Sequence, residues 1–237
     1  MNASALGFAA GFVLLMAGCG STSSHGPKPS DEATLPSECS SASSEDGSLV
    51  LDDFEDGDLL LDDERNLNGV WYVNNDGTGA QAPSPGDERR GLIQGPGSPN
   101  SPKHALHTSG AGFTRWGAFA AAHLNASRSG ACVYDLSRHA GLHLSVKGEG
   151  TLRVNLGAVP TTPIVDGGGC GTDACSDYGK SLELTSDWQS LDVSFAELEQ
   201  PAWATPAPLE LENALRVSFW AEGGELDFWL DDLRFYE

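Results

Sequence analysis

Acidic residues with the chemistry of metal ligands stand at both ends of the folded part of the sequence. Asp53 and Glu55 lie near its start, and Asp232 follows the alternating apolar residues Phe228 and Leu230 near its end. Continuing that alternation places Asp232 on the apolar face, where a carboxylate needs a cation or strong hydrogen bonds. If the terminal strands pair, we expect Asp53, Glu55 and Asp232 to hold a structural Ca²⁺ together with backbone carbonyls. A β-bulge, or hydrogen bonds from turn amides, would explain the same residues without a metal.

The five cysteines form a second group with chemical potential. Cys19 stands apart near the N-terminus, which leaves an even number, Cys39, Cys132, Cys170 and Cys175. In an exported chain such a set is typical of disulfides. Cys170 and Cys175 enclose four residues and form the natural pair, so Cys39 and Cys132 pair by elimination. A zinc site is the alternative, but Cys170 and Cys175 have no second close Cys or His pair beside them.

The N-terminus has the pattern of a bacterial lipoprotein signal. An apolar run from Ala5 to Met16 is followed by small residues and Cys19. The run is shorter than the ~20 apolar residues that span a bilayer, so it indicates an export signal. We expect residues 1–18 to be removed and Cys19 to carry lipid, which would anchor the protein in the bacterial cell envelope. The lack of Lys or Arg before Lys28 departs from that pattern, and an ordinary secretory signal is the alternative.

Composition limits the class of protein and its partners. The net charge is −21, from 34 Asp and Glu against 13 Lys and Arg, which argues against nucleic acid and anionic membrane surfaces as partners. Residues 19–47 are rich in Ser, Pro, Gly and Glu and predict a disordered tether. Residues 48–237 have the length of one β domain, and we expect a monomer.

Alternating apolar residues predict that this domain is built from many short strands. The pattern covers five clear segments, namely residues 142–146, 152–156, 191–195, 217–219 and 226–230. The turn Gly148-Glu149-Gly150 joins the first two and predicts a hairpin with one buried face. With no crossover helices between strands, the sequence indicates an all-β fold, an antiparallel β-sandwich of the jelly-roll type.

The order and spacing of several motifs resemble a known family. The motifs are Asp53-Phe54-Glu55-Asp56, Gly69-Val70-Trp71-Tyr72-x-Asn74-x-Asp76-Gly77, Gly110-x-Gly112-Phe113-x-x-Trp116-Gly117, Tyr134-Asp135-Leu136-Ser137, Leu184-Thr185-x-Asp187-Trp188-Gln189 and Leu230-Asp231-Asp232-Leu233-x-Phe235. From about residue 49 to 236 the chain resembles family 11 carbohydrate-binding modules and the related complex I intermediate-associated proteins of the galactose-binding-like superfamily. The resemblance implies a jelly roll, structural calcium and a concave sheet that holds β-glucan in the cellulose-degrading members. It does not imply catalysis.

Polar and aromatic side chains supply a candidate surface for such a ligand. His143, Arg153 and Asn155 project from the predicted hairpin onto the face opposite its core. Their donors and acceptors suit sugar hydroxyls, while the rings of Tyr72 and Trp203 suit the apolar faces of sugar rings. The sequence therefore predicts a polysaccharide-binding site at these five residues. The alternative is an ordinary polar sheet face, with the aromatic residues packed in the core; we interpret Trp71 and Trp188 in that way.

Two other functions fit the same fold. A structural or assembly scaffold would hold a protein partner on a broad apolar patch. A small glycan-active hydrolase would need two carboxylates ~5–5.5 Å apart across a cleft, and Glu183 and Asp192 are the candidates. Because the chain lacks the Gly-x-Ser-x-Gly nucleophile motif as well, we favour non-catalytic polysaccharide binding.

Overall fold

The computed structural model describes residues 38–39, 47–61, 67–222 and 224–237. The predicted signal of residues 1–18, the lipidation site Cys19 and most of the predicted tether lie outside these ranges. Within them, no helix has the length and apolar character needed to cross a membrane.

Strands dominate the part of the chain that the structure describes. Four single-turn 3-10 helices accompany them: η1 (Glu88–Arg90), η2 (Ile164–Asp166), η3 (Phe195–Glu197) and η4 (Leu211–Asn213). The strands, in chain order, are β1 (Leu49–Asp52), β2 (Trp71–Asn75), β3 (Ala80–Ala82), β4 (Ile93–Gln94), β5 (Ala105–Ala111), β6 (Ala118–His123), β7 (Asn125–Ser127), β8 (Gly130–Cys132), β9 (Gly141–Gly148), β10 (Thr151–Ala158), β11 (Tyr178–Glu183), β12 (Gln189–Ser194), β13 (Ala214–Glu222) and β14 (Glu225–Tyr236).

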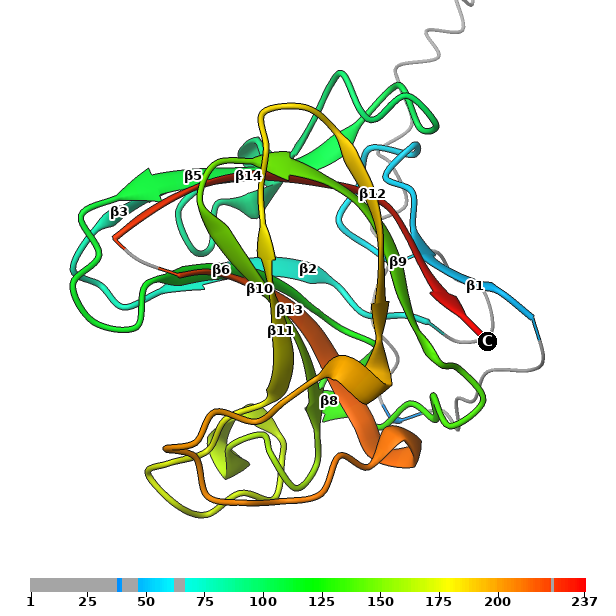
Figure 1. Cartoon of the computed structure of the whole chain (residues 1–237), viewed down its shortest axis with the longest axis vertical. Coiled ribbons are helices and arrows are strands. Elements are labelled where there is room, and N and C mark those ends of the chain that lie inside the picture. Colours follow the sequence, from blue (N-terminus) through cyan, green and yellow to red (C-terminus); the bar gives the residue numbers. More distant parts are fainter. Residues whose placement is uncertain (1–37, 40–46, 62–66, 223) are drawn as a thin grey trace, which may run out of the picture. The chain divides into compact units, whose positions relative to one another are not determined.

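Two antiparallel sheets form the sandwich (Figure 1). One has seven strands in the order β12-β9-β14-β5-β3, with β1 added to β14 and β4 to β5. The other has five strands in the order β11-β10-β13-β6-β2, and β7 and β8 form a separate small ribbon. The predicted all-β, antiparallel sandwich is confirmed.

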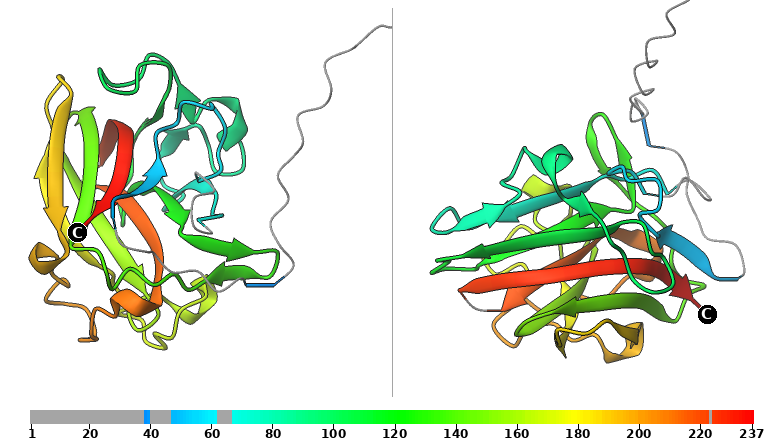
Figure 2. Two further views of the ribbon diagram at one scale, coloured as in Figure 1. Left: turned by 90° about the vertical axis from the view of Figure 1, so that its right-hand side faces the viewer. Right: turned by 90° about the horizontal axis from the view of Figure 1, so that it is seen from above.

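The first and last strands of the domain lie side by side, which meets the condition on which the shared calcium site was predicted (Figure 2). β1 pairs antiparallel with β14, so that Leu49 faces Phe235 and Asp52 faces Leu233. The register of β14 against β9 shifts between Asp231 and Arg234, which marks a β-bulge. Leu233 and Phe235 are buried again beyond it. The β-bulge, which the sequence left open as an explanation without a metal, therefore sets the orientation of residues 231–234.

The hairpin predicted over residues 142–156 is wrong. β9 pairs with β12 and β14 in the seven-stranded sheet, whereas β10 pairs with β11 and β13 in the five-stranded sheet. The turn from Gly148 to Gly150 crosses between the sheets, and a Cβ at Gly148 would stand 2.2 Å from the Asp227 carbonyl oxygen. Both strands bury leucine and valine in the same core. The alternation thus identifies each buried face but not the strand beside it.

The core and the disulfides follow the predictions from sequence. Trp71 is 1% exposed, and its ring lies 5.5 Å from that of Phe54 and 6.1 Å from that of Phe219, which confirms a packing role. Its indole Nε1 donates to Asp52 Oδ2 at 2.7 Å, which satisfies a buried donor. Cys39–Cys132 and Cys170–Cys175 are both bonded, which confirms the two predicted pairs.

Candidate functional site

The face of the five-stranded sheet that is turned away from the core carries a groove of about 960 Å³. Gly179, Asn155, Ser218, Ala121 and Tyr72 stand in one row across its five strands, each beside its neighbour in the register. Three of these residues have small side chains or none, and they form a buried row: Ser218 is 1% exposed, and the Trp220 indole Nε1 donates to its hydroxyl. A Cβ at Gly179 would stand 2.1 Å from Asn155 Oδ1, so the glycine makes room for that side chain.

Aromatic rings line one part of the groove. In the next row, Trp220 of β13 lies between Arg153 and Phe119 in the register. The Trp220 and Phe119 rings stack with centroids 4.7 Å apart, and the Trp116 ring lies 5.3 Å from that of Trp220. Trp116 is 43% exposed. The cluster therefore presents apolar ring surface to solvent inside a concave site.

Polar groups line the strand beside these rings. Arg153 and Asn155 both project from β10 into the groove. The Asn155 amide donates to the Arg153 carbonyl oxygen at 3.3 Å, and Arg153 Nη2 donates to the Glu199 carbonyl oxygen at 2.6 Å. These bonds hold both side chains in place while leaving further guanidinium donors for a ligand.

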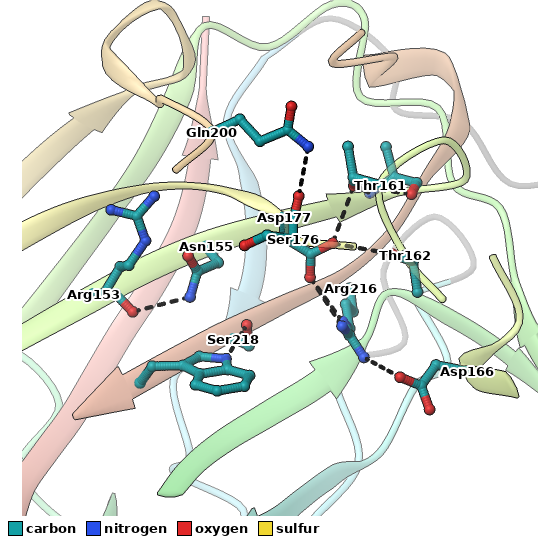
Figure 3. A network of polar contacts seen from close by, with 12 residues as sticks. Arg153, Asn155, Thr161, Thr162, Asp166, Ser176, Asp177, Gln200, Arg216 and Ser218 are labelled. Carbon is teal, nitrogen blue, oxygen red and sulfur yellow. Dashed lines mark hydrogen bonds and ion pairs between the residues drawn. The ribbon is translucent and has the colours of Figure 1, made fainter. Parts of the chain in front are cut away.

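A buried ion pair forms the other part of the groove (Figure 3). Arg216 of β13 donates from Nε and Nη2 to Asp177 Oδ2, at 3.1 and 3.0 Å. The second oxygen of Asp177 accepts from the Thr161 and Thr162 hydroxyls at 3.0 and 3.2 Å. Arg216 Nη1 also lies 3.6 Å from Asp166 Oδ2. This network ties the loop between β10 and β11 to the sheet, because its partners come from both.

The ion pair shifts the titration of the groups around it. Burial alone would lower the pKa of the Arg216 guanidinium, but the charges of Asp177 and Asp166 and the neighbouring Tyr72 raise it above its usual value. Burial raises the pKa of the Tyr72 hydroxyl as well. Burial lowers the pKa of His123, and the Arg216 charge lowers it further. Arg216 therefore stays charged while Tyr72 stays a neutral donor and acceptor at neutral pH.

Trp203 stands in a loop that several hydrogen bonds hold in place, yet its ring is 66% exposed. The Gln200 amide nitrogen donates to the carbonyl oxygens of Ser176 and Thr205, at 2.9 and 3.1 Å. The Thr205 backbone N–H donates to the Ala174 carbonyl oxygen, within the loop closed by the Cys170–Cys175 disulfide. A large apolar ring is thus held toward solvent at the groove, which packing alone does not explain.

Asp76 positions the loop that carries Trp116. One carboxylate oxygen accepts from the backbone and hydroxyl of Thr78, and the other from the backbone N–H groups of Arg115 and Gly117. Desolvation alone would raise the pKa of the Asp76 carboxyl, but these hydrogen bonds hold it well below its usual range. The loop is therefore fixed by a carboxylate that remains charged.

Four of the five predicted ligand residues lie in this groove: Tyr72, Arg153, Asn155 and Trp203. Their role in binding stays a prediction. His143 is elsewhere, on β9 of the other sheet, so its predicted place beside the groove residues of β10 is wrong. Its Nδ1 lies 2.6 Å from an Asp192 oxygen, and its Nε2 lies 3.2 Å from the Ser190 hydroxyl. The error follows from the wrong hairpin, since only pairing of β9 with β10 would put all of them on one face.

The three predicted calcium ligands each have protein partners. Asp53 accepts from the Glu55 backbone N–H, and Glu55 accepts from the Lys103 backbone and pairs with its ammonium at 3.3 Å. Asp232, in the bulge with φ 49°, pairs with Arg234 through Oδ1, while its buried Oδ2 has no hydrogen-bond partner. The described residues contain no group of three or more acidic, His or Cys side chains that could hold a metal. Calcium stays a prediction.

The two carboxylates named for the hydrolase alternative, Glu183 and Asp192, lie on different sheets. Glu183 accepts from the Thr151 hydroxyl on the five-stranded sheet, whereas Asp192 pairs with His143 on the seven-stranded sheet. Among the residues lining the groove, the only carboxylates are Asp166 and Asp177, and both contact Arg216. A general acid and base pair is therefore not assembled from these residues.

Sequence reasoning missed several groove residues. Trp220 and Arg216 alternate with Val217 and Phe219, so the same period that identified the core strand places them together on its other face. That signal was present in the sequence. The partner of Arg216, by contrast, comes from a loop 39 positions away, and no local pattern indicates it.

Comparisons with known proteins give likenesses of fold. No family model and no curated protein matches the sequence significantly. Among solved structures, a family 11 carbohydrate-binding module of the cellulosomal cellulase Lic26A-Cel5E of Clostridium thermocellum is 16% identical, covers 81% of this chain and 96% of its own, and has a TM-score of 0.49. The family 11 module in complex with a β-1,3-1,4-mixed-linked tetrasaccharide is 17% identical, covers 81% and 97%, and scores 0.48. A family 30 module from the same organism is 12% identical, covers 70% and 91%, and scores 0.42.

Proposed function

We propose that the groove on the five-stranded sheet binds a polysaccharide, of β-glucan type in its backbone, without cleaving it. The observation that carries this proposal is the combination, in one groove, of exposed Trp116 and Trp203 with the polar side chains of Arg153 and Asn155. Sugars need both, because their ring faces are apolar and their hydroxyls need directed donors and acceptors. The volume of about 960 Å³ is large enough for several sugar units.

The non-catalytic character of the proposal follows from the charges in the groove. Cleavage with acid and base carboxylates requires one group free to donate a proton and another free to act as base or nucleophile. The two carboxylates that line the groove are held by Arg216, and Asp177 also accepts from two threonines. Binding without reaction suits this arrangement.

Export and anchoring complete the proposal. Cleavage before Cys19 and lipidation of that residue would hold the protein at the bacterial cell envelope, with residues 20–47 as a tether. The two disulfides support an oxidising compartment. Labelled palmitate incorporated by the natural chain and lost in Cys19→Ala would establish the anchor, and equal labelling of both would exclude it.

Calcium would act as a structural ion close to the bulge. The buried Oδ2 of Asp232 accepts no hydrogen bond and has only His143 Nε2 near it, at 4.0 Å, which is the feature that fits a cation, although Lys103 and Arg234 already neutralise Glu55 and Asp232. We expect calcium to raise the melting temperature and Asp232→Asn to abolish that rise. A rise of equal size in both proteins would remove Asp232 from the site.

A protein-binding scaffold is the second candidate, and one observation favours it. Ile164 and Val165 are 63% and 91% exposed at the edge of the loop that flanks the groove, and exposed apolar side chains are typical of partner surfaces. An array of neutral and acidic glycans, probed with the purified chain in calcium and in chelator, separates the two. Selective binding to a glycan supports the first proposal, and a folded chain that binds none supports the scaffold.

A further inference from the structure

We propose that the groove prefers sugars with an anionic substituent, a carboxylate or a sulfate ester, over neutral sugars of the same backbone. This inference rests on the proposed function and names the substrate class of that site. It derives from the distribution of charge over the chain, the contacts of each charged group in the groove, and the place of two arginines beside the aromatic rings.

The groove has the opposite charge balance from the chain as a whole. The chain has 34 Asp and Glu against 13 Lys and Arg, whereas three arginines and two aspartates line the groove. An acidic protein whose surface serves only solubility has no reason to gather arginines in a concave site of about 960 Å³. The local excess of positive charge indicates a ligand that carries negative charge.

The acidic groups of the groove neutralise only one of its arginines. Asp177 and Asp166 both contact Arg216, which is 9% exposed and fully engaged by them. Arg153 uses one N–H for a backbone carbonyl, and the Arg115 guanidinium makes no hydrogen bond or ion pair with any described residue. Two guanidinium groups with free donors therefore remain in the site.

These two arginines flank the rings on which a sugar would stack. Arg153 is the cross-strand neighbour of Trp220, and Arg115 directly precedes Trp116, whose ring lies 5.3 Å from that of Trp220. A sugar ring on this platform would direct its substituents toward the guanidinium groups on either side. Guanidinium binds carboxylate or sulfate oxygens through paired, charge-assisted hydrogen bonds, which a hydroxymethyl group does not reproduce.

The net charge of −21 does not prevent such binding. Repulsion between exposed charges is largely screened beyond about 8 Å at physiological ionic strength, while contacts within a groove are screened much less. The overall charge thus slows the approach of a polyanion more than it weakens the close pairs with arginine.

The test is calorimetric titration of the purified full chain at 0.15 M salt (physiological ionic strength) with soluble polymers that share one backbone. The set consists of a mixed-linked β-1,3-1,4-glucan, its C6-oxidised form, the oxidised form with its carboxyl groups reduced back to alcohols, and a sulfated form. We expect the oxidised or sulfated form to bind about tenfold or more tightly than the neutral ones, since a charged hydrogen bond is worth roughly 1.5–3 kcal/mol. Of the oxidised and the sulfated polymer, the one that binds more tightly identifies the preferred anionic group.

Variants connect the preference to the arginines. Arg153→Gln and Arg115→Gln should each reduce the anionic preference about tenfold, and Arg153→Lys should restore only part of it, because lysine lacks the planar fork. Arg90→Gln is the matched control: it makes the same charge change at an exposed residue outside the groove, and the preference should stay. Melting curves verify that each variant is folded.

The outcomes separate the two proposals. Equal affinity for neutral and anionic polymers overturns this inference and leaves the proposed function intact. No affinity for any of the four polymers, together with a silent glycan array, overturns both. A preference that falls as much in Arg90→Gln as in Arg153→Gln is an effect of net charge and contradicts a role for the groove.

Discussion

The outward faces of the two sheets carry similar residues but present them differently. On the seven-stranded sheet, the Trp229 ring stacks on His107 with centroids 4.0 Å apart, and Lys147 Nζ lies 4.8 Å from both the Trp229 and Trp188 rings. On the five-stranded side, the Trp203 ring is 66% exposed at a groove. On the first face Trp229 is half-buried between its own neighbours, whereas Trp203 and Trp116, 66% and 43% exposed, remain available at the groove.

The difference comes from the size of cross-strand neighbours. Gly179, Ser218 and Ala121 lie in one buried row of the five-stranded sheet, and the larger side chains of the neighbouring rows, Arg153, Trp220 and Arg216, line the groove. On the other sheet, His107, Trp229 and Lys147 stand beside one another in the register and pack together. The presence of aromatic residues therefore does not by itself define a binding face; the groove beside the rings does.

The largest effect should come from the ion pair in the groove, compared with an exposed pair on the other sheet. Asp177→Ala leaves the buried Arg216 with only its longer, 3.6 Å contact to Asp166, and we expect it to lower the free energy of unfolding by about 3–5 kcal/mol. Asp192→Ala breaks the exposed contact with His143 and should cost only about 0–1 kcal/mol. Urea unfolding measures both. Equal losses would mean that the two faces do not differ in the way described.

A side chain added at Gly179, beneath the groove, should have the next largest effect on stability. In Gly179→Ala the new Cβ would meet Asn155 Oδ1 at 2.1 Å, so we expect a loss of about 1–3 kcal/mol and weaker ligand binding. Gly171→Ala is the matched control, because its nearest neighbour, Ile164 Cδ1, is at an ordinary 3.5 Å. Thermal unfolding and calorimetry report the two effects. Normal ligand binding by Gly179→Ala would show that the groove is not the binding site.

Two carboxylates, one on each side of the molecule, should contribute to the stability of the protein with opposite dependences on pH. Burial raises the pKa of Asp231, in the seven-stranded sheet, to about 6. Its contribution to stability is therefore complete below the unfolded value of about 4 and is lost as the pH rises through 6, a decline of up to about 3 kcal/mol. The pKa of Asp76 beside the groove is lowered, so its contribution is present above pH ~4 and lost in acid.

Unfolding in chelator between pH 4 and 7 tests this difference. Asp231→Asn should remove the decline from the natural protein's stability curve, because amide and protonated acid are both neutral. Asp76→Asn should leave that decline in place. If the Asp231→Asn curve still falls between pH 4 and 6, another group is responsible.

The smallest change in stability should come from the exposed tryptophan. Trp203→Ala should alter the free energy of unfolding by less than about 0.5 kcal/mol and weaken glycan binding about tenfold. Trp229→Ala should do the reverse, costing about 1–2 kcal/mol through its lost contacts with His107 and Lys147 while binding stays normal. A large loss of stability in Trp203→Ala would identify it as a packing residue.

Much of the fold could be predicted because its signals are local. Alternation identified the buried residues of β9 and β10, and the short spacing of Cys170 and Cys175 identified their disulfide. The pairing of those strands could not be predicted in this way, because a strand buries the same residues whether its neighbour in sequence lies beside it or across the core. His143 was misplaced for that reason alone.

The candidate site was predicted only in part, because local patterns indicate which residues share a face of one strand but not which loop folds over it. Arg153 and Asn155 share a strand, so their period placed them on one face without knowledge of the pairing. The salt bridge between Arg216 and Asp177 depends on how a loop folds back over the sheet. No pattern in the sequence specifies that contact.

The most direct test of this account is a glycan array probed in parallel with the natural full chain and with the double variant Arg153→Gln/Trp203→Ala. The account predicts that the natural chain binds a defined set of polysaccharides, leaves their chain length unchanged, and loses that binding in a double variant that melts normally. Binding that survives both substitutions, or a folded natural chain that binds no glycan, would contradict it.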